Sequence, residues 1–299
     1  MSLPVVFAVT GANKGIGYGI VKGLAEKVHG GIIYLTARND KLGTESLRKL
    51  IKELGDKRRS EINFHQLDIT SRNSCENFAS FLKKEHGGLD VLINNAGIAF
   101  RYEATEPPEE QARITIGVNY EGTKQVSNIL FPLIRDGGRV VNVSSSEGVI
   151  AGRYSDEIIA MLTSPSLTIA DIDKFTQDYI KACVENKRKE NGFPPSAYKV
   201  SKAAEIALTF IQAKELKPRN ILVNAVSKFL CIFCPEEEQF EACHPGYVKT
   251  DMTSDRAPLT IEEGADTPIY LATLEGNEPT GKFFYKRKVI DWNVPFVSS

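Results

Sequence analysis

Residues 5–17 read VVFAVTGANKGIG, an apolar run that passes into a glycine-rich turn near the start of the chain. The β-branched residues of this run predict a buried strand, and apolar side chains at helical spacing follow from Ile16 to Leu24. A turn between strand and helix can present backbone N–H groups and the helix dipole to a pyrophosphate, because glycines let the phosphate approach closely. The segment therefore predicts a dinucleotide-binding turn. Since its glycines lack the G-x-G-x-x-G spacing, an ordinary glycine turn is the alternative.

Short apolar segments and helical patterns alternate along the rest of the chain. Strands are predicted at 32–37, 62–66, 91–94, 139–143, 221–225 and 282–285, and helices at 42–54, about 75–84, 112–134 (in one piece or two), 169–184 and 198–216. Buried strands that alternate with helices predict an α/β fold, a doubly wound parallel sheet of the Rossmann type in a single domain. Ligands of such sheets bind beyond the carboxyl ends of the strands, where Arg38, Asp68 and Ser145 fall in this chain.

The composition argues against several classes of partner. The chain has 299 residues, of which 42% are hydrophobic and 25% charged, as is typical of a soluble globular protein. A net charge of -1 gives no reason to expect a nucleic acid or a membrane surface as partner. No apolar run approaches the ~20 residues that span a bilayer. The apolar run nearest the N-terminus is predicted to be a core strand and not a signal sequence. Five scattered cysteines favour a reducing, cytoplasmic location over a disulfide framework.

Residues 196–202 read SAYKVSK and place Tyr198 and Lys202 four residues apart on a predicted helix. Residues at this spacing share a helix face, so the phenol and the ammonium can converge on one reacting centre. A free tyrosine titrates near ~10, and a neighbouring ammonium favours the phenolate and lowers that pKa. The pair therefore indicates a tyrosine that exchanges a proton at neutral pH, although this spacing alone is also frequent by chance.

Taken together, the motifs resemble those of the short-chain dehydrogenase/reductase family, and more narrowly those of animal NADPH-dependent carbonyl reductases. The resemblance covers nearly the whole chain and rests on TGANKGIG at 10–17, LDI at 67–69, LDVLINNAGIAF at 89–100, GRVVNVSS at 138–145, SAYKVSK at 196–202 and HPGYVKTD at 244–251. It implies the reduction of a small carbonyl compound, an aldehyde, ketone or quinone, to an alcohol by hydride transfer.

The resemblance also implies roles for four catalytic residues. Tyr198 would be the general acid that protonates the substrate oxygen, and Lys202 would bind the nicotinamide ribose and lower the pKa of Tyr198. Ser145 would donate a hydrogen bond to the developing alkoxide, and strand alternation favours it over its neighbouring serines. Asn119 would hold a water that reconnects Lys202 to bulk protons. Taken singly, Ser145 also fits a turn serine and Asn119 a helix-bending polar residue.

The predicted cofactor is NADPH/NADP. An acidic residue after the second strand would repel a 2′-phosphate, whereas this strand is followed by Arg38, with Lys14 in the glycine turn. Asp68 would meet the adenine and Asn95 the adenine-side ribose, while a helix cap is the alternative for Asp68. The other positions that the resemblance assigns to the cofactor are Gly11, Asn13, Gly15, Ile16, Gly17, Ala96, Gly97, Tyr198, Lys202, Pro245, Gly246, Val248 and Thr250.

Four residues are expected to line the substrate pocket: Ser145, Phe100, Gln111 and Tyr247. No metal is predicted, because Cys231-x-x-Cys234 lacks the surrounding spacing of a known metal or redox site.

The chain departs from the family pattern in two segments of its single 1–299 domain, at about 150–195 and 226–242. The first implies a monomer, since a similar insertion in carbonyl reductases covers the helix face that other members use to form tetramers; a multimeric biosynthetic reductase is the alternative. The second carries the apolar run FLCIFC at 229–234 beside the active-site mouth. If it disturbs 245–250, the chain is instead an NADPH-binding, catalytically weakened isoform with a regulatory role. A translated intron is a further reading of this second segment.

Overall fold

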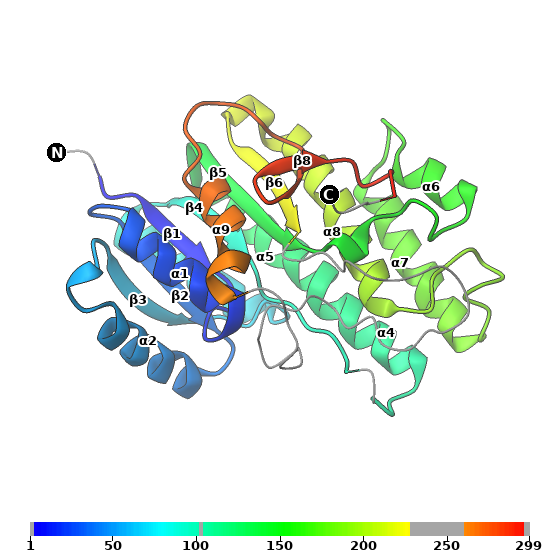
Figure 1. The fold of residues 1–299 in the computed structure, drawn as a ribbon, viewed down its shortest axis with the longest axis horizontal. Coiled ribbons are helices and arrows are strands. Elements are labelled where there is room, and N and C mark those ends of the chain that lie inside the picture. The colour runs from blue at the N-terminus through cyan, green and yellow to red at the C-terminus, as the bar shows by residue number, and fades with distance from the viewer. Residues whose placement is uncertain (1–2, 102–103, 228–259, 296–299) are drawn as a thin grey trace.

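In the computed structural model the described residues are 3–101, 104–227 and 260–295. Within them the chain forms one eight-stranded sheet with the order β3-β2-β1-β4-β5-β6-β7-β8 (Figure 1). The strands are β1 (Val6–Val9), β2 (Ile32–Ala37), β3 (Glu61–Gln66), β4 (Leu89–Asn94), β5 (Ile134–Ser144), β6 (Leu222–Ser227), β7 (Phe283–Tyr285) and β8 (Lys288–Ile290). Neighbouring strands are parallel, except that β7 and β8 form an antiparallel hairpin. The predicted doubly wound parallel sheet is confirmed.

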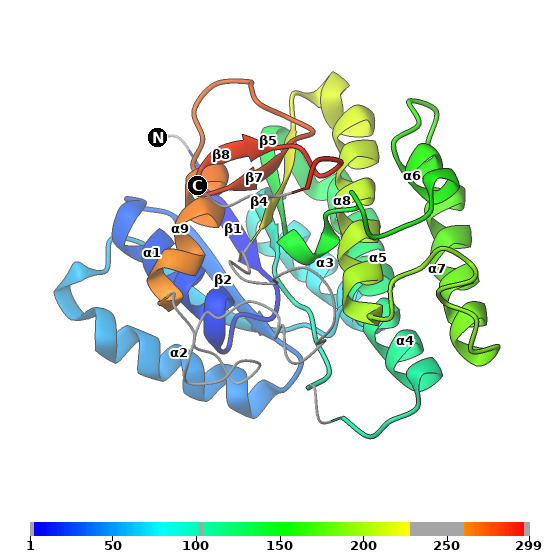
Figure 2. The same cartoon turned by 45° about the vertical axis from the view of Figure 1, so that its right-hand side comes forward.

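Helices cover both faces of this sheet. They are α1 (Gly15–Lys27), α2 (Asp40–Leu54), α3 (Arg72–His86), α4 (Pro108–Ile116), α5 (Thr123–Leu130), α6 (Asp156–Leu162), α7 (Ile169–Val184), α8 (Ala197–Leu216) and α9 (Ile261–Ala272), with the short turns η1 (Gly55–Lys57), η2 (Gly117–Gly122), η3 (Phe131–Leu133), η4 (Ser146–Gly148) and η5 (Lys217–Arg219). One face is covered by α1, α2 and α9, and the other by α3, α5 and α8 (Figure 2). Among the described helices, none combines the length and apolarity needed to cross a bilayer.

Strand β1 explains why apolar residues do not alternate with polar ones in the first apolar run of the chain. Phe7 and Val9 pack in the core beneath α1, whereas Val6 and Ala8 pack in the core on the opposite face. A parallel strand that is covered on both sides must be apolar throughout, and all four residues are buried.

The order of the strands places a ligand-binding crevice at one point of the sheet. The chain winds outward from β1 to β3, then returns to pair β4 with β1, with Val9 opposite Ile93. A doubly wound sheet binds its ligand at such a reversal, beyond the carboxyl ends of the two strands. The glycine turn after β1 and residues 95–97 after β4 both lie at this edge.

The predicted helix over 112–134 is divided, and its last residue belongs to a strand. The chain passes from α4 through the π-helical turn η2 into α5, then into the 3-10 turn η3, and Ile134 begins β5. Pro132, which lacks an N–H, lies in η3. The fifth strand therefore starts before the predicted 139, and Ile134 pairs with Leu89.

The segment at 150–195 is folded and forms α6 and α7. Helix α7 packs on α4 and α8 (Figure 2), and its first turn is closed by a capping box between Thr168 and Asp171. Phe175 and Tyr179 from α7 join the core that lies against α8. Of the second predicted insertion, 226–242, the described residues are the two that end β6.

Candidate active site

The turn after β1 approaches the turn after β4 so closely that a side chain would collide. Gly11 has φ +61°, a left-handed conformation, and a Cβ on it would lie 2.8 Å from the Cα of Ala96. A Cβ on Gly17 would collide with the side-chain nitrogen of Asn95. These two glycines therefore let the first turn of α1 lie directly against the end of β4.

Hydrogen bonds fix the two turns to each other. The Thr10 hydroxyl accepts from the backbone N–H groups of Asn95 and Ala96, both at 2.9 Å. The Asn95 side chain donates to the carbonyls of Thr10 and Gly11, at 2.9 and 3.1 Å. Asn95 therefore braces the glycine turn with its amide hydrogens, which leaves its side-chain oxygen for the predicted contact with a ribose.

The N-terminus of α1 has the charge that an anion requires. Its first turn contains no acidic residue, and the exposed Lys14 stands at its N-cap without a side-chain cap hydrogen bond. A cavity of about 710 Å³, which includes Lys14 and Glu45 in its lining, adjoins this end of the helix. Arg38 is exposed immediately after β2. Helix N-termini of this kind bind phosphate groups, and the arginine adds a planar donor.

Asp68 closes a local turn after β3. Its carboxylate accepts from the N–H and the hydroxyl of Thr70, at 2.9 and 2.7 Å. The cap of the following helix α3 is Ser71, which accepts from the N–H of Ser74 at 3.4 Å. The interpretation of Asp68 as the helix cap is therefore wrong, because the helix begins at Arg72.

Ser145 and Tyr198 meet at the carboxyl end of β5. Helix α8 starts at Ala197 under the cap of Ser196, so Tyr198 lies in its first turn, and a hydrogen bond joins the Tyr198 and Ser145 side chains. The hydroxyl of Ser144 instead donates to the carbonyl of Lys202 at 3.1 Å. Both serines therefore contact α8, but only Ser145 bonds the Tyr198 side chain, whereas Ser144 bonds a backbone carbonyl.

Turn η4 holds this arrangement close to α8. Gly148 lies so near the helix that a Cβ on it would be 2.7 Å from the carbonyl oxygen of Lys202. The Ser145 hydroxyl accepts from the N–H of Glu147 at 3.2 Å, which leaves its own hydrogen to be donated. The backbone of turn η4 therefore orients the Ser145 hydroxyl.

Lys202 is buried beside the tyrosine. Its Nζ lies 5.6 Å from the centre of the Tyr198 ring and donates to the carbonyl of Val143 at 3.2 Å. The same Nζ forms an ion pair with Glu205, at 2.6 Å from Oε2, and the two side chains are 1% and 3% exposed. Glu205 was not predicted from the sequence, although its spacing of three residues from Lys202 puts both on one helix face.

The pKa of Tyr198 is raised, the opposite of what Lys202 alone would cause. Burial is the main cause, because it disfavours the charged phenolate, and the negative charge of Glu205 adds to it. The hydrogen bond to Ser145 acts in the opposite direction and lowers the pKa, whereas Glu147 raises it further. The tyrosine therefore holds its proton, which suits a proton donor.

Asn119 lies in the π-helical turn η2, a widening that is frequent at functional sites. Its side-chain nitrogen donates to the carbonyl of Ile98 and to the Ser201 hydroxyl, both at 2.9 Å, and its oxygen accepts from the N–H of Ile98 at 2.8 Å. A Cβ on Gly97 would lie 3.1 Å from the Asn119 oxygen and 3.6 Å from the Lys202 Nζ. Asn119 is therefore at the lysine end of the site.

The structure describes two of the residues expected to line the substrate pocket besides Ser145. Phe100 is partly buried after β4, and Gln111 on α4 donates to the carbonyl of Glu106 at 2.9 Å. The remaining predicted positions, Pro245, Gly246, Tyr247, Val248 and Thr250, lie outside the described residues, as do Cys231 and Cys234.

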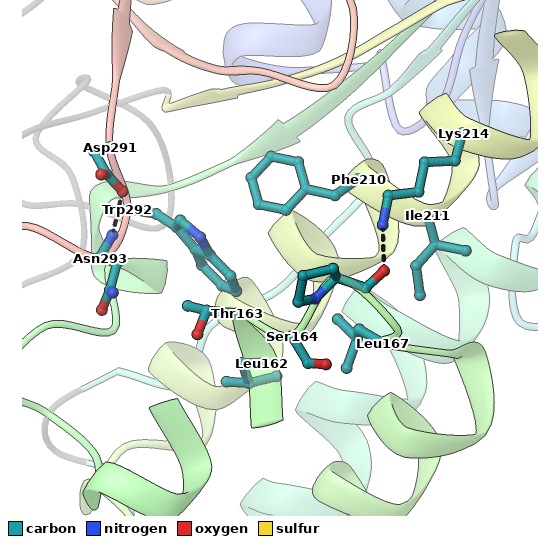
Figure 3. A pocket seen from close by; sticks show the side chains of 11 residues that line it. Leu162, Thr163, Ser164, Leu167, Phe210, Ile211, Lys214, Asp291, Trp292 and Asn293 are labelled. Carbon is teal, nitrogen blue, oxygen red and sulfur yellow. Dashed lines mark hydrogen bonds between the residues drawn. The ribbon is translucent and has the colours of Figure 1, made fainter. Parts of the chain in front are cut away.

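A cavity of about 360 Å³ lies elsewhere, between α6, α8 and the segment after β8 (Figure 3). Phe210 and Trp292 line it, and its lysine, Lys214, donates to the Pro165 carbonyl at 2.9 Å. Lys214 is several turns along α8 from Tyr198, and none of the predicted site residues lines this cavity. The cavity is therefore separate from the cluster around Tyr198.

The model of the short chain dehydrogenase family matches residues 5–155. The chain is 38% identical to carbonyl reductase [NADPH] 3 of Rattus norvegicus over 294 residues, which is 96% of this chain and 98% of that protein. It is also 38% identical to carbonyl reductase [NADPH] 1 of Sus scrofa, over 97% of this chain and 95% of that protein.

Among solved structures, salutaridine reductase from Papaver somniferum superimposes with a TM-score of 0.79 at 30% identity, over 94% of this chain and 99% of that one. Menthone neomenthol reductase from Mentha piperita gives a TM-score of 0.77, also at 30% identity, over 95% and 99% of the two chains.

Proposed function

Since this chain belongs to the short chain dehydrogenase family, we propose that it is an NADPH-dependent reductase that converts aldehydes, ketones or quinones to alcohols. The observation that carries the proposal is the cluster of Ser145, Tyr198 and Lys202 at the carboxyl edge of the sheet, beside the glycine turn. A proton donor, a hydrogen-bond donor and a cation are the groups that carbonyl reduction requires next to a nicotinamide.

The residues at the β1–α1 turn fit the cofactor. The first turn of α1 is free of acidic side chains, and Lys14 and Arg38 are cations at the edge where a 2′-phosphate would be bound. When bound, NADPH supplies the hydride that reaches the carbonyl carbon. Lys202 would hold the ribose next to the nicotinamide.

Tyr198 and Ser145 act on the substrate oxygen. As the carbonyl carbon gains a hydride, its oxygen gains negative charge, and the hydrogen bond from Ser145 stabilises that charge. The Tyr198 hydroxyl then gives its proton to the oxygen, so that one hydride and one proton convert the carbonyl to an alcohol. Burial favours this order, because the phenol keeps its proton until a developing oxyanion is present to accept it.

Tyr198 must regain its proton from solvent after each turnover. Both hydrogens of the Asn119 side chain are bonded to Ile98 and Ser201, so the predicted water would have to donate to an oxygen of Asn119, on its side chain or its backbone. That water would connect the Lys202 ammonium to bulk solvent.

Replacing Arg38 by Ala is expected to raise the KM for NADPH by about tenfold or more and to leave the KM for NADH nearly unchanged. The reason is the loss of a charge-assisted hydrogen bond to the 2′-phosphate, a group that NADH lacks, and such bonds contribute about 1.5–3 kcal/mol. Steady-state kinetics with both cofactors measures the effect. Lys41→Ala, which removes another exposed cation near the start of α2, is the matched control. Equal changes for NADPH and NADH would rule out this role of Arg38.

We further propose that the protein is a monomer. Helix α7 packs on α4 and α8, so the outer sides of these two helices are covered by the chain itself. Light scattering of the purified protein is expected to give a mass close to 33.0 kDa. The mass of a tetramer would instead favour the multimeric biosynthetic reductase.

The cytoplasm is the proposed location. The described cysteines, Cys75 and Cys183, are free and buried, as is usual for a protein of a reducing compartment. Recovery of the protein in the secretory fraction of fractionated cells would contradict this assignment.

Purified protein mixed with NADPH and a panel of quinones, ketones and aldehydes tests the proposed activity. We expect loss of the NADPH absorbance and formation of the matching alcohol. If NADPH raises the melting temperature but no carbonyl in the panel is turned over, the chain is instead the catalytically weakened, cofactor-binding isoform.

A further inference from the structure

Glu205 is a buried carboxylate that touches the lysine of the site. It lies one turn after Lys202 on α8, and its Oε2 is 2.6 Å from the Lys202 Nζ, with both side chains almost completely buried. A buried ion pair pays a large desolvation penalty, so its net contribution to stability is small. Stability alone therefore gives little reason for a carboxylate at this position.

The charge of Glu205 also reaches Tyr198. The Lys202 Nζ lies 5.6 Å from the tyrosine ring, so the phenol, the ammonium and the carboxylate form one cluster on one helix. Lys202 alone would favour the phenolate, whereas an adjacent negative charge offsets that attraction. In agreement, the Glu205 charge raises the pKa of Tyr198, second only to burial.

Among the described residues, the elements packed against α8 add few charges to this cluster. Their titratable groups in the core around the helix are Glu147 from η4, Tyr120 from η2, Tyr179 and Cys183 from α7, and the buried Tyr154 that follows η4. The Tyr120 hydroxyl donates to Asp173 and the Tyr179 hydroxyl to the Pro195 carbonyl, so both are directed elsewhere.

The sides of α4, β5 and β6 that meet α8 carry apolar or neutral polar residues, such as Ile116, Asn142 and Ala225. Glu147 acts on Tyr198, but it is also paired with Lys199 at 3.4 Å and Arg153 at 3.9 Å. Within the part of the chain that the structure describes, Glu205 is therefore the carboxylate that is paired directly with Lys202.

We propose that Glu205 is a positioning residue that neutralises the Lys202 ammonium and keeps Tyr198 in its protonated, proton-donating form. The inference rests on the proposed reductase function. Reduction requires the phenol, whereas the reverse oxidation of an alcohol requires the phenolate as base. Glu205 thus keeps Tyr198 at neutral pH in the protonation state that carbonyl reduction requires.

The pH dependence of Glu205→Gln tests this role, because glutamine keeps the shape of the side chain and removes its charge. Reduction falls as pH rises through the pKa of Tyr198, so the alkaline limb of kcat/KM should move to lower pH by about one unit or more. A loss of kcat with an unshifted pH profile would show a merely structural role and overturn the proposal.

Glu205→Asp is the conservative variant, since it keeps the negative charge. In Glu205→Asp the alkaline limb of kcat/KM should stay at its wild-type pH, independently of any change in kcat. If Glu205→Asp shifts the alkaline limb as far as Glu205→Gln does, the charge is not responsible and the proposal fails. Melting temperatures of both variants show whether they are folded.

A titration that needs no turnover separates this inference from the proposed function. Tyrosine labelled with ¹³C at Cζ is followed by nuclear magnetic resonance, and Tyr198→Phe identifies the Tyr198 signal. The wild-type signal should remain that of a neutral phenol at pH values where Glu205→Gln already shows phenolate. Identical titrations in the two proteins would overturn the role of Glu205 even if the enzyme reduces carbonyls. A shifted titration without carbonyl reduction would uphold the coupling and reject the reductase.

Discussion

Replacing Tyr198 by Phe is expected to lower kcat for carbonyl reduction by about 10²–10⁴-fold, the usual contribution of a positioned general acid. The variant lacks the hydroxyl that protonates the substrate oxygen, and the nearby groups cannot replace it. Ser145 is a weak acid, and the Lys202 ammonium is held by Glu205 and the Val143 carbonyl. Steady-state turnover of a quinone or aldehyde with saturating NADPH measures the loss.

The same substitution should leave the fold and NADPH binding nearly intact. Phe fills the space of the buried Tyr198 ring, and the lost hydrogen bond to Ser145 is worth about 1 kcal/mol. Tyr34→Phe is the matched control, since it removes the hydroxyl of another buried tyrosine. Tyr34 lies on β2, and its hydroxyl is hydrogen-bonded to His86 at 2.6 Å. Its kcat should match that of the wild type. Substantial turnover by Tyr198→Phe would refute the assigned proton donor.

Replacing Gly11 by Ala is expected to weaken NADPH binding by about 100-fold, together with a lower melting temperature. The new Cβ would lie 2.8 Å from the backbone of Ala96, and the positive φ of +61° adds a cost of about 1–2 kcal/mol. Because Ala96 and Asn95 are fixed to Thr10, the backbone at both turns must shift, and this shift displaces the N-terminus of α1. Cofactor titration by fluorescence and thermal unfolding measure the two effects.

Gly30→Ala separates the clash from the cost of the backbone conformation. Gly30 has φ +68°, close to that of Gly11, but a Cβ on it would meet no atom within 4 Å. This control should therefore lose some stability and keep its affinity for NADPH. If Gly11→Ala and Gly30→Ala bind NADPH equally well, the glycine turn is not the pyrophosphate site.

The sequence was sufficient for the parts of the fold that follow from local pattern. The β1 run is apolar on both faces and was predicted as a buried strand, and β2 lies at the predicted 32–37. Strand β7 lies within the predicted 282–285, but β8 was missed because the turn between them places Lys286 and Arg287 at positive φ, without the glycine or asparagine that signals such a turn. Helix α9 was missed too, and it has Pro268 in its interior.

The active site was predictable where one helix or one strand places the residues. The spacing of Tyr198 and Lys202 predicted their common face, and the position of Ser145 in the family motif selected it, with strand alternation in support. The direction of the Tyr198 pKa was not predictable, because it depends on desolvation and on Glu205, which act only once the helix is buried. The hydrogen bonds of Asn119 required tertiary structure as well, since Ile98 and Ser201 come from distant parts of the chain.

Hydride transfer by this chain can be followed in one measurement, the isotope content of the alcohol formed from NADPH that carries two deuterium atoms at C4 of its nicotinamide ring. The wild-type protein should convert an aldehyde or ketone to an alcohol with one deuterium on the former carbonyl carbon, and Tyr198→Phe, at the same NADPH occupancy, should form almost none. Deuterated alcohol produced by Tyr198→Phe at the wild-type rate, or none produced by a wild-type protein that binds NADPH, would contradict the mechanism.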